Sequence, residues 1–223
     1  MRAIPGLTRA WHLITALVAA TALIVQLVLV MRGINVLVVN GHIPPLSTRV
    51  IRFFSYFTVQ SNILVAGTAA SLALRPDRDG RVWRVFRLAA LFGISVTFVT
   101  YVTLLRPVVD LHGVSQLTDI GLHYVAPLMT VIGWVLCGPR PRIDEHTLML
   151  SLIWPVAYVG YSLAHGAASD WYPYPFVDVT RLGYRTALRN GLGLTVLLVG
   201  VGALFMYVDH RMSPTPSVRR RRR

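Results

Sequence analysis

Thr58 and His123 are the two residues whose side chains could together perform nucleophilic chemistry. A Thr hydroxyl beside an imidazole is a pairing of nucleophile and general base. Because imidazole has a reference pKa of about 6.5, it can accept the hydroxyl proton at neutral pH. A nearby amide such as that of Asn62 could donate a hydrogen bond to the developing oxyanion. The two residues lie far apart in the sequence, so the elements that carry them must bring them together.

The segment FSYFTVQSN places several polar side chains within an otherwise apolar stretch. Ser55, Thr58 and Asn62 are spaced three and four residues apart, so in one helix they share a face, with Ser61 beside them. Ser and Thr in membrane helices often bond to their own backbone or allow close helix packing, which is the interpretation favoured for Ser55 and Ser61. For Asn62, an interhelical hydrogen bond and a functional role are equally consistent with the sequence.

A second polar stripe surrounds His123. Asp119, His123 and Pro127 follow one another at steps of four, and Asp119 either caps a helix start after Thr118 or orients His123. His165 is expected in the same leaflet, near the outer end of another helix. The two stripes predict a small polar chamber with Thr58 and His123 as catalytic residues. The residues predicted to contact the substrate there are Ser61, Asn62, Asp119 and His165.

Composition indicates that these residues belong to a polytopic membrane protein. The chain has 223 residues, 54% hydrophobic and 14% charged, with a mean hydropathy of +0.57. Its apolar runs approach the roughly 20 residues that cross a bilayer core of about 30 Å. They are too long and continuous for barrel strands, so we predict an all-α integral membrane bundle of six transmembrane helices. The predicted helices are Trp11–Met31, Ile51–Leu74, Val85–Leu105, Leu117–Leu136, Thr147–Ala167 and Gly191–Val208.

The distribution of Arg predicts the orientation. Most of the 22 basic residues fall on the side that holds both termini, which is therefore expected to be cytoplasmic. The first segment is longer than a signal-peptide core, so we expect a retained anchor. Residues 1–210 would form the transmembrane domain, and residues 211–223 an Arg-rich tail that contacts anionic lipid headgroups. The Arg residues predicted on the outer side are Arg32, Arg49, Arg52, Arg106, Arg181, Arg185 and Arg189.

This topology puts the two candidate catalytic residues at one depth. Thr58 lies seven residues past Ile51, and His123 lies six past Leu117. At 1.5 Å per residue, both lie about 10 Å below the outer boundary. An ionisable side chain well within a span is a functional hypothesis by default.

Other residue types exclude several functions. All basic residues are Arg, so a retinal or pyridoxal Schiff base and a P-loop lysine are excluded. Cys137 is the single cysteine, and no Cys/His group has zinc-ligand spacing, so we expect no metal and no cofactor. The basic residues flank apolar runs and do not form an aromatic-laced surface, so we expect no nucleic-acid partner. Exclusive use of Arg also indicates a GC-rich genome.

Three motifs carry a family resemblance. SYFTVQSN around Thr58, LHYVAPLM around His123 and WPVAYVGYSLAHGAASDWYPYPFVDV resemble the androgen-induced-gene family of multi-pass membrane proteins and its bacterial relatives. The resemblance extends from the first predicted helix to the sixth. It implies a threonine hydrolase that cleaves fatty acid esters of hydroxy fatty acids, with Thr58 as nucleophile and His123 as general base. Asn62 and His165 lie in matching motifs without an implied role.

Other functions remain open at the level of sequence. The main alternative is a non-catalytic lipid-binding or scaffold protein that holds a headgroup in the same chamber. A haem bound axially by His123 and His165 is a further possibility. A transporter is disfavoured because the spans contain few charges that could couple ions.

Overall fold

A computed structural model describes residues 5–34, 42–108 and 110–214, and this part of the chain is helical and contains no β-strand. Six of its helices are long and apolar enough to cross a membrane, which confirms the predicted all-α bundle. These candidate spans are Gly6–Met31, Phe57–Leu74, Arg81–Leu105, Val114–Cys137, Glu145–Ser169 and Val179–Arg211.

Several of the spans are built from more than one helical element. The elements in chain order are α1 (Pro5–Met31), α2 (Leu46–Ser55), α3 (Phe57–Leu74), α4 (Arg81–Thr100), the π-helical turn η1 (Tyr101–Leu105), the 3-10 turn η2 (Arg106–Val108), α5 (Val114–Ile120), the π-helical turn η3 (Gly121–Val125), α6 (Ala126–Cys137), α7 (Glu145–Ser151), α8 (Ile153–Ser169), the 3-10 turn η4 (Pro175–Val177) and α9 (Val179–Arg211).

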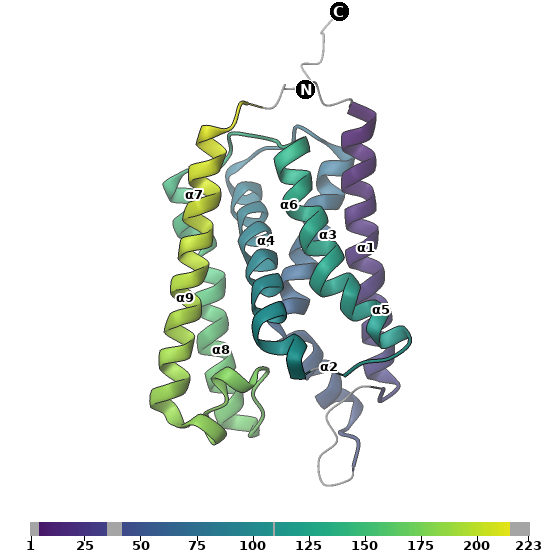
Figure 1. Cartoon of the computed structure of the whole chain (residues 1–223), viewed down its shortest axis with the longest axis vertical. Coiled ribbons are helices and arrows are strands. Elements are labelled where there is room, and N and C mark those ends of the chain that lie inside the picture. The colour runs from purple at the N-terminus through teal and green to yellow at the C-terminus, as the bar shows by residue number, and fades with distance from the viewer. Residues whose placement is uncertain (1–4, 35–41, 109, 215–223) are drawn as a thin grey trace, which may run out of the picture.

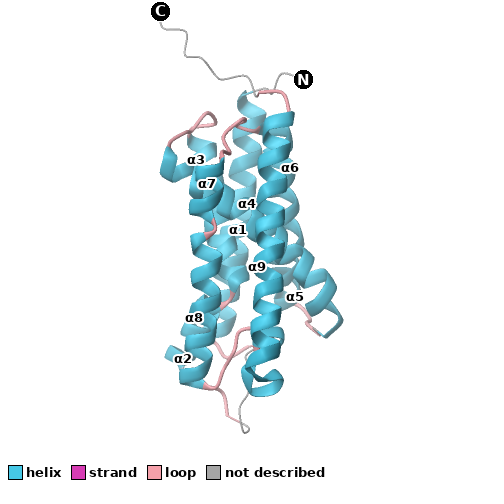
Figure 2. Ribbon diagram, turned by 90° about the vertical axis from the view of Figure 1, so that its left-hand side faces the viewer, coloured by secondary structure: helices cyan, strands magenta, loops and turns pink. Residues whose placement is uncertain are grey.

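The spans stand side by side in an upright bundle (Figures 1 and 2). α1 packs along α3 and α6, and α4 contacts α3, α6, α7 and α9. The span Arg81–Leu105, which α4 begins, is the most enclosed: 61% of the residues in its most apolar 18-residue stretch are buried. The corresponding share for the span of α9 is 22%, so α9 turns most of its surface toward lipid. The start of α1 and the end of α9 lie at one end of the bundle, and α2 lies at the other. This agrees with two termini on one side of the membrane.

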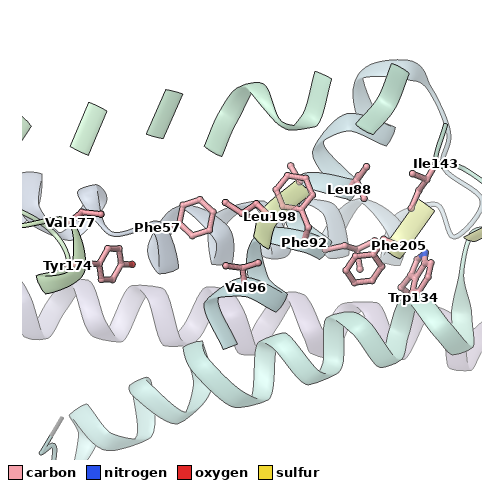
Figure 3. Packing of buried hydrophobic residues seen from close by; sticks show 12 residues of the cluster. Phe57, Leu88, Phe92, Val96, Trp134, Ile143, Tyr174, Val177, Leu198 and Phe205 are labelled. Carbon is pink, nitrogen blue, oxygen red and sulfur yellow. The ribbon is translucent and has the colours of Figure 1, made fainter. Parts of the chain in front are cut away.

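Aromatic and aliphatic side chains fill the centre of the bundle (Figure 3). Phe57 stacks on Trp154 with ring centroids 4.6 Å apart, which ties α3 to α8. Gly93 of α4 leaves room for the Trp154 ring, because a Cβ at Gly93 would lie 2.8 Å from it. Trp134 and Phe205 join α6 to α9 at a centroid distance of 4.9 Å. The core thus fixes α3 and α8, which frame the polar residues described below.

The second predicted helix is broken, and the candidate span begins after the break, at Phe57. Instead of one helix from Ile51 to Leu74, the chain leaves the helical conformation at Tyr56 (φ −75°, ψ 130°), which separates α2 from α3. Aromatic and β-branched side chains crowd this stretch and lower its helix propensity. The Ser55 hydroxyl also donates to the Ile51 carbonyl, 2.8 Å away, which competes with regular helix hydrogen bonding. The break makes Thr58 the second residue of a new helix.

The last span begins earlier than predicted. α9 starts at Val179, well before the expected Gly191, and turns at Gly183, whose φ of 71° suits a residue without a side chain. The added portion carries the exposed Arg181, Arg185 and Arg189, so it is not part of the apolar run from which the helix was predicted. α9 ends at Arg211, while residues 215–223, most of the predicted Arg-rich tail, lie outside the described residues.

Candidate active site

Thr58, His123 and Asp119 form a connected chain of polar contacts. Thr58 Oγ1 lies 3.3 Å from His123 Nε2, and His123 Nδ1 lies 2.9 Å from Asp119 Oδ1. Because a carboxylate can only accept, His123 donates through Nδ1 and leaves Nε2 to accept the Thr58 hydroxyl proton. Asp119 lies inside α5, so it is not the N-cap considered from the sequence, and it orients the imidazole instead.

Tyr101, the first residue of η1 after the end of α4, supports this chain of contacts. Its hydroxyl donates to Asp119 Oδ2, and its ring stacks on the His123 imidazole at a centroid distance of 4.0 Å. Tyr101 and His123 each belong to a π-helical turn, η1 and η3, within otherwise α-helical spans. Such wide turns shift the side chains that follow and are frequent at functional sites. Two hydrogen-bond partners and one stacking partner therefore fix the orientation of His123.

Tyr174 approaches Thr58 from the loop between α8 and α9. The Thr58 backbone N–H donates to the Tyr174 hydroxyl at 3.2 Å, and Thr58 Oγ1 lies 3.3 Å from the same oxygen. The first N–H groups of a helix have no partner within the helix, so the break at Tyr56 frees this donor. Burial raises the pKa of Tyr174 to about 12, so its hydroxyl stays protonated and able to donate at neutral pH.

The conformation of the loop is fixed on both sides of Tyr174. Pro173 and Pro175 flank the tyrosine, and a residue before proline favours the extended backbone that Tyr174 adopts (φ −135°, ψ 140°). Tyr172 covers Gly166 so closely that a Cβ there would lie 2.1 Å from the Tyr172 ring. No spacing in the sequence predicted the contact between Tyr174 and Thr58. The flanking prolines were the available signal of a fixed side chain.

Gln60 and Tyr158 satisfy backbone carbonyls released at the break. The Gln60 amide donates to the Phe54 carbonyl at 3.1 Å and accepts from Trp154 Nε1 at 2.9 Å. Tyr158 donates to the Ser55 carbonyl at 3.0 Å. Because these carbonyls are no longer bonded within a helix, the side chains replace the lost hydrogen bonds. Thr58 is thus the member of the stripe that faces a cavity, and Ser55, Ser61 and Asn62 do not share it.

Three of the predicted substrate contacts are corrected by their surroundings. Asn62 donates both amide protons to backbone, to Thr58 O at 2.9 Å and to Leu122 O at 3.2 Å, so neither remains for an oxyanion. Ser61 is fully buried between α3 and α4, where its hydroxyl accepts from Thr97. His165 packs its ring against Tyr161 and Trp171. None of the three lines either cavity described below.

Two cavities meet at Thr58. The larger encloses about 390 Å³ and is lined by His123, Asp119 and Tyr101 together with Arg49 and Arg52. The smaller encloses about 60 Å³ and has mostly apolar walls, which include Phe57, Val96 and Leu198. Thr58, Leu105 and Tyr174 line both. A molecule bound at the Thr58 hydroxyl can therefore place a polar part on one side and an apolar part on the other.

His165 does not line the cavity that His123 lines, so the geometry gives no support to a haem held between these two residues. Within the described ranges, no group of three or more His, Cys, Asp and Glu side chains is arranged to hold a metal ion.

Comparisons of the chain with protein-family models, curated proteins and solved structures find no match in any of the three.

Proposed function

We propose that this multi-pass membrane protein is a hydrolase that cleaves a lipid ester, with Thr58 as nucleophile and His123 as general base. The observation that carries the proposal is the series of contacts from Thr58 Oγ1 through His123 to Asp119. Acyl transfer by a hydroxyl requires a nucleophile, a base and a group that orients the base. The 3.3 Å between Oγ1 and Nε2 is at the long end of this geometry and is expected to shorten in the reacting complex.

In the first step, Thr58 Oγ1 forms a bond to the ester carbonyl carbon and its proton passes to His123 Nε2. The carbonyl oxygen becomes an oxyanion, to which the Tyr174 hydroxyl is placed to donate. The Asp119 carboxylate stabilises the imidazolium that forms. The bond to the alcohol oxygen then breaks, and His123 returns its proton to that oxygen as the alcohol leaves.

The second step releases the acyl group. A water molecule gives a proton to His123 Nε2, and its oxygen bonds to the acyl carbon attached to Thr58. The bond between this carbon and Thr58 Oγ1 then breaks, and the proton on His123 returns to Oγ1. The products are a fatty acid and an alcohol, and the side chains regain their starting protonation states.

The proposed substrate class is that of fatty acid esters of hydroxy fatty acids. This choice rests on the resemblance of the motifs around Thr58 and His123 to the androgen-induced-gene family. Two cavities that meet at Thr58 suit a substrate with chains on both sides of one ester bond. We propose a bacterial plasma membrane as the location, on the resemblance to bacterial relatives of that family.

The test is turnover of a synthetic palmitic acid ester of hydroxystearic acid by the purified protein in lipid nanodiscs. Wild type should release palmitate, and Thr58→Ala and His123→Gln should each lose at least about 100-fold in kcat. Thr68→Ala is the matched control: Thr68 is a buried threonine on the same helix whose hydroxyl bonds its own backbone at the Leu64 carbonyl. Turnover by Thr58→Ala at the wild-type rate would contradict the proposal.

A different outcome would favour the non-catalytic alternative. If wild type binds the ester and releases no palmitate, the cavity holds lipid without cleaving it.

A further inference from the structure

Arg49 and Arg52 form a basic end of the larger cavity that the steps of ester cleavage do not use. Both residues line the cavity that Thr58 and His123 line. Arg52 lies in the last turn of α2, and its guanidinium carbon lies 5.0 Å from the centroid of the Trp171 ring. Arg49 lies one turn earlier and donates through Nη1 to the carbonyls of Val30 and Met31, each 2.9 Å away.

No acidic side chain in the described part of the chain neutralises these two charges. All nine acidic residues of the chain lie within the described ranges, and none comes within 4.0 Å of Arg49 or Arg52. Asp119 is the acidic residue that lines this cavity, and its carboxylate already accepts from His123 and Tyr101. The lining therefore has an excess of positive charge.

Part of each guanidinium is buried without a partner. Arg49 Nε and Arg52 Nη1 have no hydrogen-bond partner in the part of the chain that the structure describes. Burial of an unpaired donor on a charged group is costly, so the site favours a ligand that can accept these hydrogen bonds. The Trp171 face supports the Arg52 guanidinium and orients its plane.

We propose that this end of the cavity binds the anionic head of a lipid, a carboxylate or a phosphate, and that Arg52 recognises it with Arg49 in support. A planar guanidinium matches either anion through two parallel hydrogen bonds. That the anion belongs to the same lipid whose ester meets Thr58 rests on the proposed function. The site would then select esters that also carry a charged end and discriminate against neutral esters.

The binding test uses laurate, dodecyl phosphate and the neutral dodecanol, each titrated calorimetrically into the purified protein in nanodiscs. Wild type should bind at least one of the two anions at least about 10-fold more tightly than dodecanol. The better anion identifies the head as carboxylate or phosphate. Arg52→Gln should lose the preference, and Arg52→Lys, which keeps the charge without the planar fork, should retain part of it. Arg185→Gln, which removes an exposed Arg on the same side outside the cavity, should retain the preference in full.

The kinetic test compares an ester that carries a free carboxylate with its methyl ester. The ratio of the two kcat/KM values should favour the acid about 10- to 100-fold in wild type and approach one in Arg52→Gln. Equal binding of laurate, dodecyl phosphate and dodecanol by wild type, or an unchanged preference in Arg52→Gln, would overturn the anion site. Arg52-dependent anion binding without hydrolysis of any ester would retain this site and overturn the proposed function.

Discussion

Replacement of Asp119 by asparagine tests whether the carboxylate holds His123 in the tautomer that can act as a base. Asp119 accepts from two donors, His123 Nδ1–H and the Tyr101 hydroxyl. An asparagine has one acceptor oxygen, so its NH2 group must face one of these two partners. If the NH2 group faces His123, the imidazole carries its proton on Nε2 and cannot accept from Thr58.

The expected fall in kcat of Asp119→Asn is large because Asp119 and His123 are both enclosed. The side chains of Asp119 and His123 are each 14% exposed, so water has little access to replace the lost charge. Loss of the orienting carboxylate in a serine triad lowers kcat by about 10⁴, and general base catalysis is generally worth about 10²–10⁴. For Asp119→Asn we expect a fall of about 10³–10⁴ in kcat, or about 4–5.5 kcal/mol, with KM changed by less than about 3-fold.

The assay is palmitate release in nanodiscs, together with the rate at which a long-chain alkyl fluorophosphonate labels the protein. Asp110→Asn is the matched control, because Asp110 also lies beside a histidine, His112, but both side chains are exposed. It should keep wild-type rates. If Asp119→Asn keeps more than about a tenth of the wild-type kcat, the proposed role of the carboxylate is wrong.

Three further predictions concern the elements that surround the site. Tyr174→Phe removes the proposed oxyanion donor and should lower kcat about 10²–10³-fold with little change in KM, while Tyr184→Phe, at an exposed position, should not; equal kcat values for the two variants would contradict this role. Gly166→Ala should lower the thermal unfolding midpoint by several degrees, because its Cβ would overlap the Tyr172 ring, at a cost of about 1–3 kcal/mol. Gly160→Ala on the same helix, where a Cβ meets nothing within 4 Å, is the control, and an equal effect of both changes would refute the packing argument. The hydrogen bond from Arg84 lowers the pKa of Asp79 to about 2, so the stability that this pair contributes is present above about pH 4 and is lost as the pH falls through 2. The unfolding midpoint of Asp79→Asn should therefore depend less on pH between 4 and 2 than that of wild type or Asp77→Asn, and identical profiles would contradict the assignment.

The number and approximate position of the spans could be predicted because hydrocarbon imposes length and apolarity on every crossing segment. The break at Tyr56 could not, since no Gly or Pro marks it and its exposed carbonyls are satisfied by Gln60 and Tyr158, one of which comes from a distant helix. Thr58 and His123 do lie together, with 3.3 Å between Oγ1 and Nε2, but the depth count from Ile51 does not hold, because the chain leaves the helix at Tyr56 and the candidate span begins at Phe57.

The roles of Asn62 and Tyr174 depended on tertiary contacts that no spacing rule contains. Asn62 shares the helix face of Thr58, yet its amide is directed to two backbone carbonyls. Tyr174 lies in the loop between α8 and α9, and its hydroxyl reaches Thr58 because this loop packs Tyr174 and Val177 into the core. Sequence patterns thus singled out Thr58 and His123, while the contacts of Thr58 with Tyr174 required the structure.

The most direct measurement is mass spectrometry of the protein after reaction with a long-chain alkyl fluorophosphonate in nanodiscs. Fragmentation should place one phosphonate on the Thr58 side chain, and the adduct should be absent from Thr58→Ala and strongly reduced in His123→Gln. An adduct on another residue, or labelling of Thr58→Ala at the wild-type rate, would show that Thr58 is not the nucleophile of this membrane protein.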